Sequence, residues 1–287
     1  MKAANCLMVA GPRIPLAVVS LGTIALVMAA VMVPATLRAE ESSRGKPTVV
    51  MVHGAFAESS GWNPTTAKLL AKGYTVIAVA NPLRGVKVDA SYLGSVLDRL
   101  KGPVILVGHS YGGSVITVAA AGRSGVKGLV YVSGLAPDVG ESASSLVAKF
   151  PGSTLGPTLA PPVLLADGGK DLYIMQDKYN AQFCADLPAS DAKVMATTQR
   201  PIVAAAFEEP TGAAAWRTIP SWFLYGSLDK NIPPSVHAFM AKRAGAKKTI
   251  EVKGASHVVM ISHPDILVQL IDAAALETSH YSTNNSP

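Results

Sequence analysis

A serine that could act as a nucleophile lies in the sequence GHSYG at residues 108–112, a G-x-S-x-G arrangement. The apolar run 103–107 precedes it directly, and a stretch of helical composition begins at Tyr111. Small residues in this sequence and at Gly113 permit a sharp turn from a strand into a helix, which exposes the serine hydroxyl on strained backbone. The positive end of the helix is directed at the same point. The pattern therefore predicts that Ser110 is a nucleophile.

A serine hydroxyl needs a neighbouring base near neutral pH, and His257 is the predicted base. It follows the last apolar strand of the sequence, in Gly254–His257, where a loop at the carboxyl edge of a parallel sheet can reach Ser110. The remaining histidines have simpler local interpretations, as turn, spacer, helix or tail residues: His53, His109, His237, His263 and His280.

A carboxylate is needed to orient the imidazole and to stabilise its protonated form. Asp229 follows the apolar run 221–225, which gives the chain order Ser, Asp, His. Asp138 is the alternative because it follows another apolar run, 128–132, and could reach the same histidine from the next loop. We favour Asp229 and expect Asp138 to begin an inserted segment.

Two backbone N–H groups are predicted to hold the oxyanion that develops during acyl transfer. One comes from the loop after the first strand, His53-Gly54-Ala55-Phe56, through Phe56 or Ala55, and the other from Tyr111. Apolar residues near the same sheet edge are expected to bind substrate, with Phe56 and Tyr111: Trp62, Leu135, Val258 and Met260.

These residues need a scaffold, and the chain alternates short apolar runs with helical stretches, which indicates βαβ units and a mainly parallel sheet of about six strands. The predicted strands are 48–52, 74–79, 104–107, 128–132, 221–225 and 249–252. The predicted helices are 62–72, 89–100, 111–122, 234–244 and 264–276.

The alternation breaks once, in the proline-rich segment 137–216, whose middle has helical composition. A segment of this length between two sheet strands indicates a helical lid or a subdomain. The expected organisation is one α/β domain at 47–276 that carries this insertion, a polar linker at 40–46 and a flexible tail at 277–287.

The first 39 residues resemble an export signal, with Lys2 and Arg13 before the apolar run 14–33 and small residues after it. Cleavage after Ala35 or Ala39 would give a periplasmic or secreted protein. The run is also close to the length that spans a bilayer, so a retained membrane anchor is the alternative.

The formal charge of +6 comes partly from three basic residues of that segment, which contains no acid. The remainder of the chain has 22 basic and 19 acidic residues and no dense basic run. A nucleic-acid partner is therefore not expected.

With these motifs in place, the sequence resembles the α/β-hydrolase superfamily, and within it bacterial single-domain hydrolases related to plant methylesterases and hydroxynitrile lyases. The resemblance covers about residues 47–276 and rests on HGAF, NPL, GHSYGGSVIT, LVYVSGLAPDVGES, TIPSWFLYGSLDKNIPP and GASHVVMISHP. It implies the α/β-hydrolase fold, no metal or organic cofactor, and cleavage of a small-molecule ester through an acyl-serine intermediate.

Two departures from the hydroxynitrile lyases of this group bear on the reaction. Those enzymes carry a lysine directly after the catalytic histidine and a threonine in the oxyanion loop, where this chain has Val258 and Gly54. The sequence therefore favours a serine esterase for small or medium apolar substrates. A ligand-binding protein without catalysis, a cofactor-free perhydrolase and a hydroxynitrile lyase-like enzyme remain as alternatives.

Overall fold

The computed structural model describes residues 45–283 of the chain. The predicted export segment, with its cleavage sites and the alternative anchor at 14–33, lies outside the described residues. Between residues 45 and 283, no helix is long and apolar enough to cross a membrane.

The central sheet has six parallel strands in the order β2-β1-β3-β4-β8-β9, which confirms the predicted fold class. Each predicted strand is present, with the following bounds: β1 (Thr48–Val52), β2 (Val76–Val79), β3 (Val104–His109), β4 (Val126–Val132), β8 (Ser221–Gly226) and β9 (Lys248–Val252). Val49, Val50 and Met51 of β1 are all fully buried. Consecutive buried residues are expected where helices cover both faces of a sheet, because neighbouring side chains of a strand point to opposite faces.

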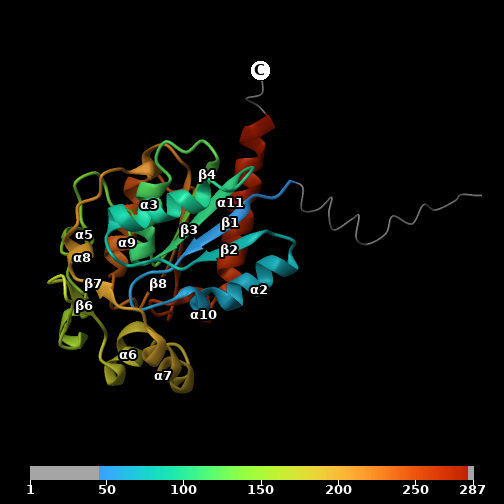
Figure 1. Ribbon diagram of the computed structural model, residues 1–287. Helices are drawn as coiled ribbons and strands as arrows, with labels where there is room; N and C mark the ends of the chain where they lie inside the picture. The colour runs from blue at the N-terminus through green and yellow to red at the C-terminus, as the bar shows by residue number, and fades with distance from the viewer. Residues whose placement is uncertain (1–44, 284–287) are drawn as a thin grey trace, which may run out of the picture.

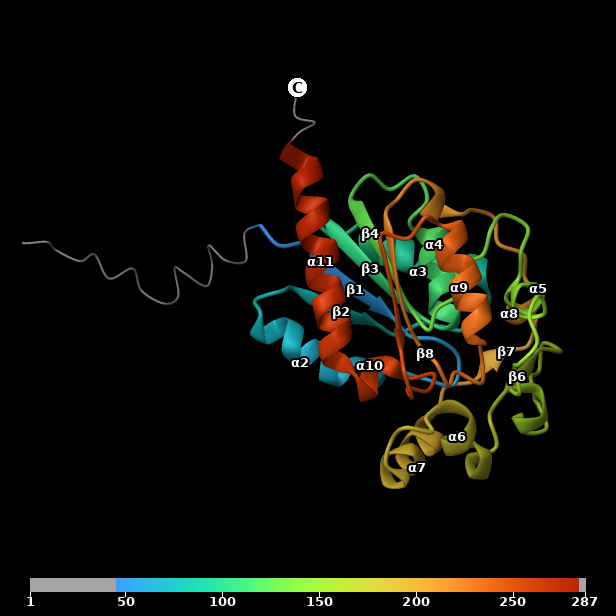
Figure 2. The same ribbon diagram turned by 180° about the vertical axis from the view of Figure 1, so that it is seen from behind.

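Helices cover the two faces of the sheet in two groups (Figures 1 and 2). One group comprises α2 (Asn63–Ala71), α10 (Val259–Ser262) and α11 (Pro264–Thr283), and the short 3-10 helix η1 (Ser59–Trp62) precedes α2. The other comprises α3 (Val86–Leu97), α4 (Tyr111–Ala119) and α9 (Pro234–Arg243).

Helix α11 continues to Thr283, so the tail predicted to begin at residue 277 is wrong in its starting point. Thr278 is buried, and its hydroxyl donates a hydrogen bond to the carbonyl of Ala274 at 2.8 Å. Burial of Thr278 shows that α11 still packs on the domain beyond residue 276, where the apolar pattern predicts its end.

The insertion between β4 and β8 lies at the carboxyl ends of the strands (Figure 1). Its helices are α5 (Ala143–Val147), η2 (Gly156–Thr158), α6 (Gln176–Phe183), α7 (Ala189–Thr198), α8 (Ala205–Glu208) and η3 (Ala215–Arg217). It also contains an antiparallel sheet of β5 (Val163–Leu164), β6 (Lys170–Leu172) and β7 (Ile202–Val203), which the prediction of a helical lid or a subdomain does not include. Strands of two or three residues are too short to show an alternating pattern.

Candidate active site

Ser110 occupies the turn between β3 and α4, with a backbone conformation of φ 53° and ψ −126° that is strained for a residue with a side chain. Its N–H donates to the carbonyl of Val132 at 3.2 Å, and its carbonyl accepts from the N–H of Leu135 at 3.0 Å. A Cβ atom at Gly112 would lie 2.4 Å from the carbonyl oxygen of Val52, so only glycine permits this approach of α4 to β1. The predicted strand-turn-helix context of the serine is confirmed.

His257 and Asp229 form a buried pair at the ends of β9 and β8. Nδ1 of His257 lies 2.7 Å from Oδ2 of Asp229, and the exposed fraction of the two side chains is 1% and 0%. Because an ionised carboxylate only accepts hydrogen bonds, Nδ1 is the donor in this pair, and in the neutral ring Nε2 is then the nitrogen that can accept a proton. Nε2 is buried and has no hydrogen-bond partner within residues 45–283, and the residue His257 lines the same cavity as Ser110.

The Asp229 carboxylate is also held by groups near it in the sequence. Oδ1 accepts the backbone N–H groups of Asn231 at 2.9 Å and Ile232 at 3.0 Å. Oδ2 accepts a second imidazole, from His237, at 3.3 Å. Burial alone would raise the pKa of Asp229, but the charge of His257 and the hydrogen bonds from both histidines outweigh it and hold this pKa below its usual range.

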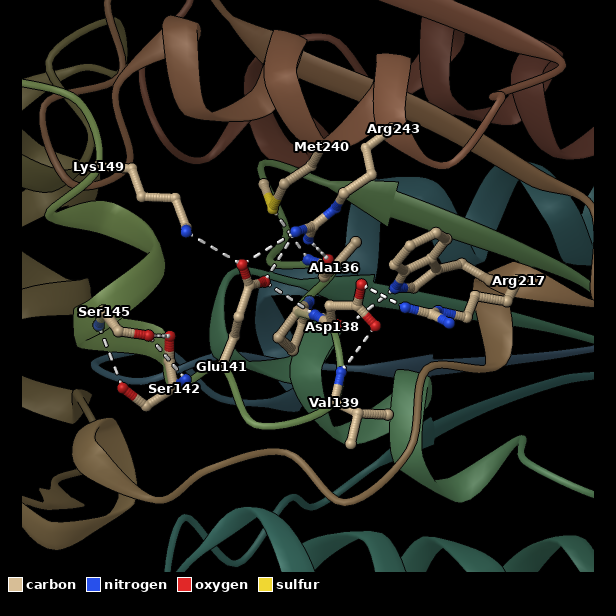
Figure 3. Close-up of polar contacts among 12 residues, drawn as sticks. Ala136, Asp138, Val139, Glu141, Ser142, Ser145, Lys149, Arg217, Met240 and Arg243 are labelled. Atoms are coloured by element: carbon tan, nitrogen blue, oxygen red, sulfur yellow. Dashed lines mark hydrogen bonds and ion pairs between the residues drawn. The ribbon is translucent and has the colours of Figure 1, made fainter.

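Asp138, the alternative carboxylate, lies in a different environment (Figure 3). Its Oδ2 accepts a hydrogen bond from Nη2 of Arg217 at 2.7 Å, and this bond lowers the pKa of Asp138. The structure therefore pairs His257 with Asp229 and places Asp138 at the start of the insertion, as the sequence favoured.

The oxyanion loop is tied to the insertion through Phe56, which has a positive φ of 59°. The N–H of Phe56 donates to the carbonyl of Arg200 at 3.0 Å, and the carbonyl of Phe56 accepts from the Tyr179 hydroxyl at 2.7 Å. The first-choice prediction of the Phe56 amide as an oxyanion donor is therefore wrong, because that group is already bonded. The N–H groups of Ala55 and Tyr111, by contrast, have no partner within the described chain, and both residues line the cavity of Ser110.

Asn81, in the loop after the neighbouring strand β2, braces this loop. Its side-chain amide donates to the carbonyl of His53 at 2.9 Å, and its backbone N–H donates to Nε2 of His53 at 3.0 Å. Burial lowers the pKa of His53 to about 4, so this imidazole is neutral near pH 7. Sequence reasoning missed the role of Asn81, although the residue belongs to the NPL motif.

The cavity that contains Ser110 has a volume of about 310 Å³. Its walls come from the oxyanion loop, the start of α4, the loops after β4, β8 and β9, and the insertion. The lining residues are Ala55, Phe56, Ser110, Tyr111, Leu135, Ala143, Ser144, Val147, Ala148, Ser153, Leu155, Gly156, Leu159, Phe183, Phe207, Asn231, Ile232 and His257. No aspartate, glutamate, lysine or arginine is among these described residues, so the wall suits an uncharged apolar group.

Three predicted substrate-binding residues lie elsewhere. Val258 and Met260 line a second cavity, of about 360 Å³, between η1, α7 and α10. Trp62 is fully buried, with its ring edge-to-face against His109 at 6.2 Å between centroids, and is therefore a core residue. Leu135, Phe56 and Tyr111 do line the cavity of Ser110, as predicted. No group of three or more His, Cys, Asp or Glu side chains in the described part of the chain is arranged to hold a metal ion.

A serine at a strand-to-helix elbow, followed along the chain by a paired aspartate and histidine, is the arrangement that α/β hydrolases carry at the end of their sheet. The profile of the alpha/beta hydrolase family matches residues 49–270. The chain belongs to this family.

Two relatives match this chain over nearly their whole length. An alpha/beta hydrolase of Aspergillus novofumigatus is 26% identical over 252 residues, which cover 81% of this chain and 98% of the relative. The alpha-hydroxynitrile lyase of Arabidopsis thaliana is 25% identical over 250 residues, which cover 79% and 96%. The crystal structure of polyneuridine aldehyde esterase superposes with a TM-score of 0.69 at 18% identity, covering 79% of this chain and 98% of that chain. The family profile and these relatives confirm the predicted α/β-hydrolase group with its plant hydroxynitrile lyase neighbours, and the crystal structure shows the same fold; the bacterial origin stays a prediction.

Proposed function

We propose that this hydrolase is a serine esterase that cleaves uncharged carboxylic esters of small or medium size through an acyl-serine intermediate. The observation that carries the proposal is the state of His257. Its Nδ1 is bound to Asp229, its Nε2 has no partner among the described residues, and the residue lines the cavity that Ser110 also lines.

The proposed reaction begins when Nε2 of His257 accepts the proton of Ser110 as the hydroxyl oxygen attacks the ester carbonyl. Ser110 and His257 are not hydrogen-bonded in the structure, and such contacts commonly tighten only when substrate is bound. The amides of Ala55 and Tyr111 receive the oxyanion, and Asp229 stabilises the imidazolium of His257. His257 then gives its proton to the departing alcohol.

Water completes the cycle by the same route in reverse. Nε2 of His257 takes a proton from water as its oxygen attacks the acyl-serine carbonyl, and the proton returns to Ser110 as the acid leaves. Each step moves one proton through one nitrogen atom, so the reaction requires no metal or organic cofactor.

The substrate class follows from the walls of the cavity. Aromatic rings of Phe183 and Phe207 and aliphatic side chains such as Leu135 and Ile232 offer no counter-charge to an ionic group. Burying an unpaired charge against them is unfavourable, whereas each apolar carbon gains free energy on transfer from water. We therefore expect acetyl to short-chain or aryl esters to be preferred over substrates with a free carboxylate.

Lyase chemistry is the second candidate because a hydroxynitrile lyase is among the relatives. The position after His257 holds Val258, which is fully buried and faces the second cavity, so it offers no cation to a cyanide ion. A Cβ atom at Gly54 would lie 2.5 Å from Cβ of Ser110, so the loop has no room for a threonine there. Both observations support hydrolysis over the lyase reaction.

The test of the proposal is the turnover of p-nitrophenyl acetate and butyrate by the wild type and Ser110→Ala. We expect the variant to keep its fold and to lose at least about 10⁴-fold in kcat/KM. Ser114→Ala is the matched control, since Ser114 is a buried serine of α4, the helix that follows Ser110, and its hydroxyl has no partner within the described residues.

Labelling by a fluorophosphonate separates an esterase from a non-catalytic binding protein. An esterase is labelled at Ser110 within minutes, and Ser110→Ala is not labelled. Equal ester turnover by the wild type and Ser110→Ala would refute the proposal. Failure of the wild type to react with the label would favour the binding protein.

A further inference from the structure

Two imidazoles share one oxygen atom of Asp229. Oδ2 lies 2.7 Å from Nδ1 of His257 and 3.3 Å from Nε2 of His237. An ionised carboxylate has no proton to donate, so both ring nitrogens carry their protons and donate them to this oxygen. The mechanism above uses only the first of these two bonds.

His237 is fixed in place by helix α9 and by strand β8. Its side chain is 1% exposed, and its ring is stacked on the ring of Tyr225 with 4.9 Å between centroids and 17° between planes. The opposite oxygen of Asp229, Oδ1, is held by the amides of Asn231 and Ile232. The carboxylate is therefore held from three directions, and His237 supplies the only side-chain contact to it besides His257 in the described part of the chain.

We propose that His237 is a positioning residue, which divides the charge of Asp229 between two imidazoles and fixes the orientation in which the carboxylate receives His257. This proposal rests on the proposed role of the Ser110, His257 and Asp229 group. It adds a fourth side chain, which acts on the reaction only through Asp229.

The groups that face His237 are few, and burial outweighs those that favour its protonated form. Asp229 and His257 face it from the loops after β8 and β9, and Tyr225 faces it from β8 with Glu251 of β9 next to the Tyr225 ring. Burial is the largest effect on the pKa of His237 and lowers it, as does the charge of His257, against the opposing effects of Asp229 and of the Gly134 backbone. His237 is therefore a neutral donor near pH 7. It donates a hydrogen bond to the Asp229 carboxylate without adding a positive charge beside His257.

The consequence is a weaker pull of Asp229 on the proton that His257 accepts during the reaction. Without the second donor, more of the carboxylate charge would act on the protonated ring of His257. The protonated form would then persist to higher pH, and the acidic limb of kcat/KM would move in that direction.

His237→Phe tests this inference, because phenylalanine keeps an aromatic ring on Tyr225 and removes the donor. His237→Gln is the matched control, since its side-chain amide reaches the position of Nε2 and can still donate. We expect His237→Phe to move the acidic limb upward by about half to one pH unit, and His237→Gln to restore most of the difference. We also expect kcat of His237→Phe at the optimum to fall about tenfold.

Proton NMR of the bond between His257 and Asp229 provides a readout that needs no ester. The Nδ1 proton of His257 should resonate at lower field in His237→Phe than in the wild type or His237→Gln. A role in packing alone would lower the melting temperature and leave the resonance and the pH profile unchanged. That result would overturn the proposal, as would identical behaviour of the phenylalanine and glutamine variants.

Failure of this proposal can be told apart from failure of the esterase proposal. If the resonance moves as expected but none of the proteins hydrolyses an ester, the role of His237 stands and the esterase assignment falls. If His237→Phe does not fold, His237→Asn replaces it, because asparagine is too short to place a donor at the position of Nε2. The same shift of the resonance is then expected.

Discussion

The loops after the neighbouring strands β4 and β8 each carry an aspartate, and the two carboxylates have different partners. Asp229, after β8, is fully buried and accepts two imidazoles and two backbone amides. Asp138, after β4, has a side chain that is 21% exposed and is paired with Arg217 at the surface. Imidazoles can gain or lose a proton near pH 7, whereas a guanidinium stays charged. The partners of Asp229 can therefore take part in proton transfer, whereas the ion pair of Asp138 with Arg217 has a structural role.

The loop after β4 shows what such a structural arrangement contains (Figure 3). Arg243 of α9 donates to Glu141 at 2.9 Å and to the carbonyl of Ala136 at 2.8 Å. Its guanidinium also lies over the ring of Trp216, 5.1 Å from the centroid. Lys149 adds a second cation to Glu141 at 3.3 Å. These contacts fasten the start of the insertion to α9.

The largest expected effect comes from removing the charge of each aspartate in turn. Asp229→Asn should reduce kcat for a p-nitrophenyl ester by about 10⁴-fold, because an amide does not hold His257 in the required tautomer. Asp138→Asn, the matched control, should stay within about threefold of the wild type. Losses within tenfold of each other would remove the distinction between the two loops.

A smaller effect is expected when the loop after β4 is released. Arg243→Ala should lower the free energy of unfolding by about 2 kcal/mol, since Glu141 and the Ala136 carbonyl lose a charged donor. Lys242→Ala changes an exposed residue of the same helix and should alter the stability by less than about 0.5 kcal/mol. Urea unfolding measures both. An equal effect of the two variants would show that the contacts of Arg243 do not fasten the insertion.

The smallest effect concerns acid and salt. The pKa of each aspartate is lowered in the folded protein, so the unfolded chain takes up protons first as the pH falls below about 4, and stability declines. In about 0.5 M NaCl the contribution of the partly exposed Asp138 should be screened, and that of the buried Asp229 should persist. Urea unfolding between about pH 3 and pH 5 should therefore show a shallower decline for Asp229→Asn than for Asp138→Asn. If the free energy of unfolding falls equally with pH in both variants, the two aspartates do not differ in their electrostatic environment.

The sequence predicted the parts of the site that local pattern determines. The glycines around Ser110 and the apolar runs before Asp229 and His257 place each group at the end of a strand, and parallel strands bring those ends to one edge. The six strands were predictable for the same reason, since strands covered on both faces are nearly continuous in apolar residues.

The remaining features depend on contacts between distant parts of the chain. The backbone N–H of Phe56 donates its hydrogen bond to the carbonyl of Arg200, which lies far along the sequence. Trp62 packs beneath His109 rather than in the cavity. His237 was interpreted as a helix residue, and its contact with Asp229 depends on the rotation of α9 about its axis. A sequence pattern predicts whether a segment is a helix or a strand more readily than it predicts the rotation of a helix about its axis or its contacts with distant segments.

Phe56 bonds to the insertion through both of its backbone groups, to Arg200 beyond α7 and to Tyr179 on α6. The segment that shapes substrate choice thus also supports the loop that stabilises negative charge. Exchanging the insertion for that of a relative would alter selectivity and rate enhancement together. We therefore expect substrate selectivity and rate enhancement to change together in this protein. Variants from directed evolution of the pocket should be screened for turnover as well as for substrate preference.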